Sequence, residues 1–128
     1  MPATVERIEY DPNRTAYIAL IKYEDNLRNY ILCPQNLKVG EKIKSGKNVE
    51  IKVGNCLELK DIPPGTSMHN VELIPGNGGK LARSAGSSAQ TSGMDDNYRV
   101  IKLSSGEIRK VINTARATIG TVSNADHQ

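Results

Sequence analysis

TAYIALIKY, the stretch at residues 15–23, decides the fold class. Its β-branched, aromatic and aliphatic residues favour a strand. The polar residues Glu24, Asp25 and Asn26 end this run, and a second apolar run, YILC at residues 30–33, stops before a proline. Two such runs on either side of a polar loop predict a β-hairpin.

The rest of the chain repeats this pattern of short apolar runs. The clearest is VEIKV at residues 49–53, which alternates strictly between apolar and polar residues. Glycine, proline and asparagine separate the runs, and no stretch has a long helical period. Short strands at regular spacing predict an all-β protein built from small barrels. The other predicted strands lie at residues 7–10, 56–59, 68–74, 98–103, 107–111 and 117–122.

A change of composition after residue 74 predicts a domain boundary. Residues 75–93 contain five of the eleven glycines of the chain. We therefore predict two domains, residues 1–74 and residues 75–128. The glycine-rich stretch reads as a flexible linker or as a loop that packs on the domains. Its apolar members, which favour the packed loop, are Leu81, Ala82, Ala85 and Ala89.

Composition excludes several classes of protein. The 128 residues include five tyrosines but no phenylalanine or tryptophan, and the net charge is +3. No apolar run approaches the ~20 residues of a membrane-spanning helix. The sequence therefore argues against a membrane protein, a secreted disulfide scaffold and a coiled coil, and we expect no membrane partner.

The glycine-rich stretch is the leading candidate for a binding site. Between residues 71 and 92 the only acidic residue is Glu72, whereas Lys80 and Arg83 supply positive charge. Glycine backbone can approach another backbone closely, and amides, hydroxyls and guanidinium groups bind phosphate. Composition alone leaves open a surface loop with incidental charges. The candidate contacts in this stretch are Gly78, Gly79, Lys80, Arg83, Ser84 and Gly86.

Two further clusters of cations are candidates. Arg14 ends the turn DPNR at residues 11–14, and Arg109, Lys110 and Arg116 lie near a predicted strand turn. Each cluster can also be an ordinary solvated surface. Because aromatic residues are scarce, the sequence favours recognition of folded RNA by shape and phosphate contacts over base stacking.

An enzyme is not supported by any motif in the chain. Cys33 and Cys56 lie outside any CxxC or zinc-ligand spacing, and we expect both to be reduced and buried. Cys33 followed by Pro34, or Cys56 with His69, could form a nucleophile pair, so a cysteine-dependent enzyme is kept as an alternative. We predict no catalytic residue, no metal and no cofactor.

Seven segments in order resemble one family, the second protein of the large ribosomal subunit, or universal L-two family. The most specific are EYDPNR at residues 9–14 and GGKLARSAG at residues 78–86. The resemblance covers about residues 4 to 127. Further matching segments are YILCPQNLKVGEKI, VGNCLELKDIPPGT, MHNVEL, LSSGEIRKV and ARATIGTVSNADH.

The resemblance implies an OB-fold barrel followed by an SH3-like barrel that binds large-subunit ribosomal RNA. It implies roles in subunit association and in supporting the peptidyl-transferase region, with other large-subunit ribosomal proteins as partners. Arg14 matches the arginine of the family's DPNR turn, and Arg83 matches that of its LARSAG loop, so both are expected to contact RNA. Further correspondences are Arg7, Lys80, Ser84, Arg109, Lys110 and Arg116.

The chain departs from the family pattern in two ways. The family usually has GKGGQ where residues 76–80 are GNGGK, so the cation stands at Lys80 rather than at the position of Asn77. The chain also matches only the central RNA-binding region, so the SH3-like barrel is expected to be incomplete at its C-terminus. A separate chain that carries the missing C-terminal part is therefore an implied partner.

The resemblance also bears on compartment and on alternatives. The first segment looks most like alphaproteobacterial and mitochondrial members, so we expect a mitochondrial ribosome, with the bacterial cytoplasm or a plastid ribosome as alternatives. A free-standing OB-type nucleic-acid-binding module outside the ribosome is the alternative function.

Overall fold

Strands form almost all of the regular structure in the computed structural model, which describes residues 2–13, 15–46 and 49–123. Within these ranges the one helical element is a single 3₁₀ turn, and no helix is long and apolar enough to cross a bilayer. The all-β prediction is confirmed. The elements are β1 (Ala3–Asp11), β2 (Ala16–Tyr23), β3 (Arg28–Leu32), β4 (Lys42–Ile43), β5 (Cys56–Glu58), η1 (Leu59–Asp61), β6 (Ser67–His69), β7 (Val71–Glu72), β8 (Gly79–Leu81), β9 (Ala89–Asp95), β10 (Tyr98–Leu103), β11 (Ile108–Ile112) and β12 (Arg116–Ile119).

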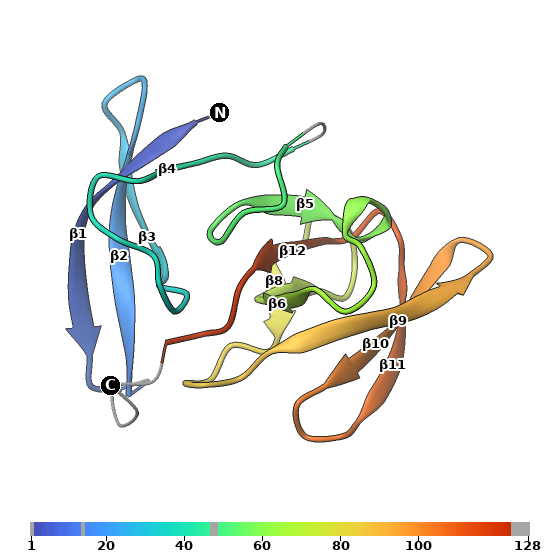
Figure 1. Ribbon diagram of the computed structural model, residues 1–128. Helices are drawn as coiled ribbons and strands as arrows, with labels where there is room; N and C mark the ends of the chain where they lie inside the picture. The colour runs from blue at the N-terminus through green and yellow to red at the C-terminus, as the bar shows by residue number, and fades with distance from the viewer. Residues whose placement is uncertain (1, 14, 47–48, 124–128) are drawn as a thin grey trace.

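The N-terminal sheet has the strand order β3-β2-β1-β4 and stands at one end of the elongated molecule (Figure 1). The predicted hairpin is confirmed, because β2 and β3 pair antiparallel from Ile18 opposite Leu32 to Lys22 opposite Arg28. A register shift in β1 between Val5 and Arg7 bends that strand. The curled sheet is consistent with an OB-fold barrel.

The C-terminal sheet has six strands in the order β11-β10-β9-β6-β12-β5. Its long β9–β10–β11 arm extends away from the N-terminal sheet (Figure 1). The predicted strands at residues 98–103 and 107–111 pair antiparallel as the β10–β11 hairpin, and at its turn the Gly106 amide donates to the Leu103 carbonyl at 2.9 Å. This curled sheet is consistent with an SH3-like barrel.

The predicted domain boundary at residues 74 and 75 does not coincide with a division between the sheets. Strands β5 and β6 precede residue 75, yet β5 pairs with β12, and β6 pairs with both β12 and β9. The two large sheets separate along the chain between β4 and β5 instead.

The predicted strand at residues 49–53 is wrong. Asn55 explains why, because its side-chain Nδ2 donates to the Glu50 carbonyl at 3.2 Å and its backbone amide donates to the Lys52 carbonyl at 3.0 Å. These turn contacts take up two of the carbonyls that a neighbouring strand would need. Alternation of residue types therefore occurs here without a sheet partner.

Two other strand predictions change in detail. The run at residues 68–74 is interrupted at Asn70, whose φ of +53° ends β6 before β7 begins. In β10 the side chain of Arg99 points inward rather than outward, and its guanidinium Nη2 donates to the carbonyls of Lys60 and Ile62, at 3.1 Å each. Arg99 therefore fastens β10 to η1 as a structural cation.

Apolar side chains join the two sheets as well as filling each of them. Ala16, Leu32 and Val122 form a small buried cluster where the start of β2 and the end of β3 meet the segment after β12, and Ala85 packs on it. A β-bridge between Pro34 and Val122 runs through the same place.

His69 lies buried in β6, and its Nδ1–H donates to the Gly120 carbonyl at 3.0 Å. Burial lowers the pKa of His69 below its usual value near 6.5. The unfolded chain therefore takes up more protons than the folded chain as the pH falls through 6.5.

We expect the free energy of unfolding to decrease between pH 7.5 and pH 5.5 through His69. Urea unfolding at the two pH values measures this change. The variant His69→Gln, which keeps an N–H donor for Gly120, should flatten the difference. An equally steep pH dependence in that variant would contradict the assignment to His69.

Candidate nucleic-acid interface

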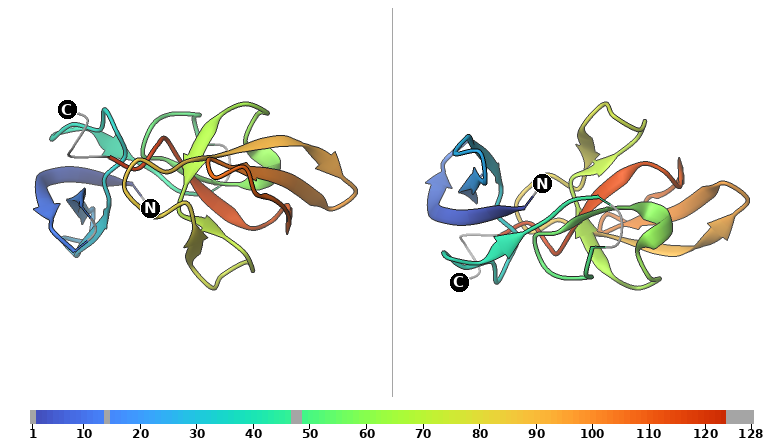
Figure 2. Two further views of the ribbon diagram at one scale, coloured as in Figure 1. Left: turned by 90° about the horizontal axis from the view of Figure 1, so that it is seen from below. Right: turned by 90° about the horizontal axis from the view of Figure 1, so that it is seen from above.

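The β7–β8 hairpin carries the first part of the glycine-rich stretch and projects to one side of the molecule (Figure 2). Gly76 and Gly78 have φ of +84° and +81°, a backbone region that glycine adopts without strain. Just after this turn, Lys80 is exposed on β8. The sequence therefore builds a tight turn that presents one cation.

Glu72 fixes this turn to the C-terminal sheet. Its Oε2 accepts a hydrogen bond from the Gly78 amide at 3.2 Å, and its Oε1 accepts one from the Arg116 amide at 2.8 Å. Glu72 is the only acidic residue of residues 71–92, and both of its carboxylate oxygens accept hydrogen bonds from the protein's own backbone. Sequence reasoning gave Glu72 no role, although its isolation among neutral and basic residues was a signal.

The loop after β8 is pinned at several points rather than flexible. The Gly86 amide donates to the Val122 carbonyl at 3.0 Å, and the Val122 amide donates to the Ser87 carbonyl at 3.1 Å. Ala85 packs on the cluster that joins the sheets, which confirms the packed loop. Arg83 and Ser84 remain exposed on this fixed backbone.

The glycines of the stretch serve the protein's own packing as well. A Cβ on Gly79 would lie 2.7 Å from the Asn70 backbone carbonyl, so β8 approaches Asn70 more closely than another residue allows. The amides of Gly78 and Gly86 already have acceptors in Glu72 and Val122. A contact of these glycines with RNA would therefore come from close backbone approach rather than from those two amides.

The remaining candidates lie apart from this hairpin and loop. The β12 residue Arg116 is tied to the hairpin through Glu72. In contrast, Arg109 and Lys110 lie on β11, at the edge of the C-terminal sheet, where Arg109 is 3.6 Å from Glu107. Arg14 lies outside the described residues.

Arg7 lies on β1 of the N-terminal sheet, within a small hydrogen-bonded cluster. Its Nε is 2.6 Å from the Glu9 carboxylate, and the Tyr30 hydroxyl donates to the same carboxylate at 2.9 Å. Tyr30 and Glu9 together raise the pKa of Arg7. Much of its positive charge is therefore balanced within the protein.

Both cysteine thiols are harder to deprotonate than a free thiol. Both are unpaired in disulfides, and Cys33 is buried as expected, whereas Cys56 is only partly buried. Burial raises the pKa of Cys33 to about 11 and also raises that of Cys56. Thr118 stands between Cys56 and His69 in the sheet, because it pairs with both. The described residues contain no group of three or more His, Cys, Asp or Glu side chains that could hold a metal.

Comparison with known proteins identifies the family. A family model described as ribosomal proteins L2, RNA binding N-terminal domain, matches residues 1–45. A second, described as ribosomal proteins L2, C-terminal domain, matches residues 52–128. The chain is 58% identical over 128 residues to the large ribosomal subunit protein uL2 of Pelagibacter ubique (strain HTCC1062), and this match covers 100% of the chain and 46% of that relative. The chain thus spans less than half of the length of this relative, and it belongs to the ribosomal L2 family.

Proposed function

We propose that this chain is a structural constituent of the large ribosomal subunit and binds large-subunit ribosomal RNA beside other large-subunit ribosomal proteins. The observation that carries the proposal is the match of residues 1–45 and 52–128 to the two ribosomal L2 domain models, the first of which is described as RNA-binding. No catalytic step belongs to this proposal. The chain acts by holding RNA in place.

The main RNA contact in this proposal is the glycine-rich stretch, which comprises the β7–β8 hairpin and the loop after β8. Lys80 and Arg83 neutralise phosphates, and the arginine fork also suits a guanine edge. The exposed hydroxyl of Ser84 can add a phosphate hydrogen bond. Because Glu72 and Val122 already fix the backbone, little conformational entropy is lost when RNA binds.

The remaining cations extend this contact. Arg116 adjoins the hairpin, whereas Arg109, Lys110 and Arg7 would meet RNA elsewhere on the surface. Arg14 is proposed as an RNA contact only because it matches the arginine of the family's DPNR turn. Each site residue stays a prediction until it is tested.

The finer parts of the function also stay predictions. They are subunit association, support of the peptidyl-transferase region and a separate chain for the C-terminal part. The curated relative is bacterial, which favours a bacterial ribosome over the mitochondrial one expected from the sequence.

We further propose that the domains divide between residues 45 and 52, where the family models and the sheets both separate.

Arg83→Ala tests the RNA contact. At 0.15 M salt we expect about fivefold weaker binding to deproteinised large-subunit ribosomal RNA, and a salt slope reduced by about 0.9 or less, as the loss of one phosphate contact requires. Filter binding at several salt concentrations measures both. Lys60→Ala is the control, because Lys60 lies on η1, outside the hairpin and the loop, and is paired with Glu58 at 3.3 Å.

Unchanged affinity and slope in Arg83→Ala would remove Arg83 from the site. Equally tight binding to short unstructured oligonucleotides and to folded ribosomal RNA would favour the free-standing module instead. Sedimentation of cell extracts tests the ribosomal assignment directly, because the chain should travel with the large subunit.

A further inference from the structure

The N-terminal sheet carries a row of cations that lie far apart in the sequence. Arg28 on β3 is opposite Lys22 on β2, Lys22 is opposite Thr4 on β1, and Thr4 is opposite Lys42 on β4. Residues directly opposite one another in a sheet share a face. With strands ~4.8 Å apart, this row of four residues spans ~14 Å across the whole sheet. We call it the lysine row: Arg28, Lys22, Thr4 and Lys42.

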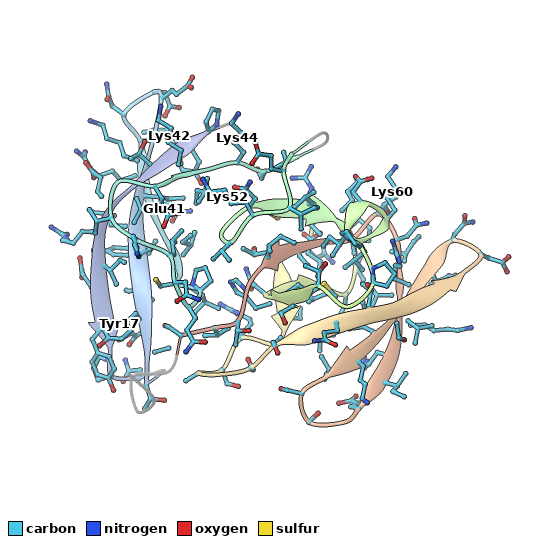
Figure 3. All side chains as sticks on the ribbon, in the orientation of Figure 1. Tyr17, Glu41, Lys42, Lys44, Lys52 and Lys60 are labelled. Carbon is cyan, nitrogen blue, oxygen red and sulfur yellow. The ribbon has the colours of Figure 1, made fainter. Side chains whose placement is uncertain are left out.

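Two more lysines extend the row beyond β4. Lys44 follows β4, and its amide is held by the Asn55 side-chain oxygen at 2.8 Å. The side chain of Lys52 reaches back, with its Nζ 3.3 Å from the Lys42 carbonyl. Figure 3 shows Lys42, Lys44 and Lys52 near one another along the strip of chain that leads from β4 towards β5. Lys42, Lys44 and Lys52 are all exposed.

A groove of about 600 Å³ runs along Lys22, Thr4 and Lys42 of this row, and Lys44 lines it as well. Three lysines and two glutamates are among its lining residues, and the carboxylate of Glu6 is bound to Arg28 at 2.6 Å. The Arg28 hydrogen bond lowers the pKa of Glu6 and balances its charge. The groove therefore has an excess of positive charge. The lining side chains that bear on this argument are Thr4, Glu6, Lys22, Tyr23, Glu24, Lys42 and Lys44.

We propose that the groove along the lysine row binds the phosphate backbone of RNA, as a second contact separate from the glycine-rich hairpin. This inference rests on the proposed function. The whole row lies within residues 1–45, the segment that matches the RNA-binding domain model. Of the sequence-predicted residues in that segment, Arg7 is balanced by Glu9, and Arg14 is outside the described residues.

The chemistry of the groove suits a strand of phosphates. Each lysine ammonium is a compact charge with three donors, which can follow a backbone without reading sequence. Thr4 places a hydroxyl between Lys22 and Lys42, where it can donate to a phosphate oxygen. Tyr23 also lines the groove, but its side chain packs on the core of the N-terminal sheet, so the positive charge and the Thr4 hydroxyl carry the argument. The groove thus offers the charged track along which a phosphate backbone can lie.

The double variant Lys22→Gln with Lys42→Gln tests this contact. At 0.15 M salt we expect roughly tenfold weaker binding to deproteinised large-subunit ribosomal RNA, and a salt slope lower by about 1–2. The matched control is Lys60→Gln with Lys102→Gln, which makes the same charge change away from the groove and should alter binding less than about twofold. Equal effects of the two variants would overturn the proposal.

A second measurement does not depend on the variants. Acetylation of the wild-type chain, followed by mass spectrometry, should show Lys22 and Lys42 protected by RNA, with Lys60 and Lys102 reacting as before. Poly-L-glutamate serves as the alternative polyanion. Protection by poly-L-glutamate without protection by RNA would assign the groove to an acidic polypeptide and overturn the proposal.

Failure of this inference is distinguishable from failure of the proposed function. If Arg83→Ala weakens RNA binding and the lysine variant does not, the loop after β8 binds RNA and the groove does not. If the wild-type chain shows no affinity for ribosomal RNA, the proposed function itself fails.

Discussion

Replacement of Gly120 by alanine is expected to lower the free energy of unfolding by roughly 2–5 kcal/mol. Gly120 has a φ of +116°, and a Cβ there would lie 2.9 Å from the Pro34 Cβ and 3.4 Å from Val53 Cγ1. Alanine therefore adds backbone strain and a steric contact in a buried position. The position also carries two hydrogen bonds, because the Gly120 amide donates to Ser67 at 2.8 Å and its carbonyl accepts from His69.

Gly106→Ala is the matched control. Gly106 has a φ of +93°, and nothing lies within 4 Å of the Cβ that alanine would add. This variant bears backbone strain alone, so we expect a loss of about 1–2 kcal/mol. Urea unfolding followed by circular dichroism measures both variants. Equal losses at the two positions would show that the close contact of the added Cβ with Pro34 does not contribute to the loss of stability at Gly120.

The result at Gly120 bears on how the two sheets are coupled. Pro34 belongs to the segment after β3, and Gly120 follows β12, so this contact joins the segment after the N-terminal sheet to the end of the C-terminal sheet. If alanine pushes these segments apart, the loop that includes Gly86 is affected as well, because that loop is bonded to Val122. We therefore expect Gly120→Ala to weaken RNA binding through the loop as well as to destabilise the fold.

Local patterns in the sequence predicted most of the strands but not their partners. The β2–β3 and β10–β11 hairpins follow from apolar runs on either side of polar turns, because both strands and the turn are neighbours along the chain. The pairing of β6 with β9 and β12 joins segments about 20 and 50 residues apart. Composition changed at residue 75, but this long-range pairing extends across that position.

The strand predicted at residues 49–53 also shows that a local pattern does not reveal whether a strand has a partner. Alternation is necessary for a half-buried strand, but a ladder also needs a partner strand. Here Asn55 supplies the hydrogen bonds that a partner would supply, and Ile51 stays exposed. A side chain four residues further along thus decides the structure of the segment.

The candidate site was predicted where it is local and missed where it is not. The glycine-rich stretch places Lys80 and Arg83 close together in sequence, so composition was enough to propose them as RNA contacts. The lysine row combines residues 4, 22, 28 and 42, which become neighbours only through the register of four strands. Without that register, Lys22 and Lys42 are two unremarkable surface lysines.

Ile101→Ala is expected to lower the free energy of unfolding by about 2–5 kcal/mol, because it leaves a cavity in the larger core. Ile101 is fully buried in β10, between Thr91 on β9 and Arg109 on β11. The urea midpoint should fall with little change in slope. Ile108→Ala is the matched control: it removes the same atoms from a side chain that is 65% exposed, and should change stability by less than about 0.5 kcal/mol.

A measurement of RNA affinity shows whether Ile101→Ala affects only the stability of the core or also the RNA-binding surface. Ile101 is enclosed by the sheet and touches no solvent, so the variant should bind ribosomal RNA with unchanged affinity wherever it remains folded. RNA in excess should also restore part of the lost thermal stability, because a ligand of the folded state shifts the unfolding equilibrium. A fall in affinity at low temperature, with the fold intact, would mean that β10 and β11 contribute to the proposed RNA contact, through the positions of Arg109 and Lys110 on β11.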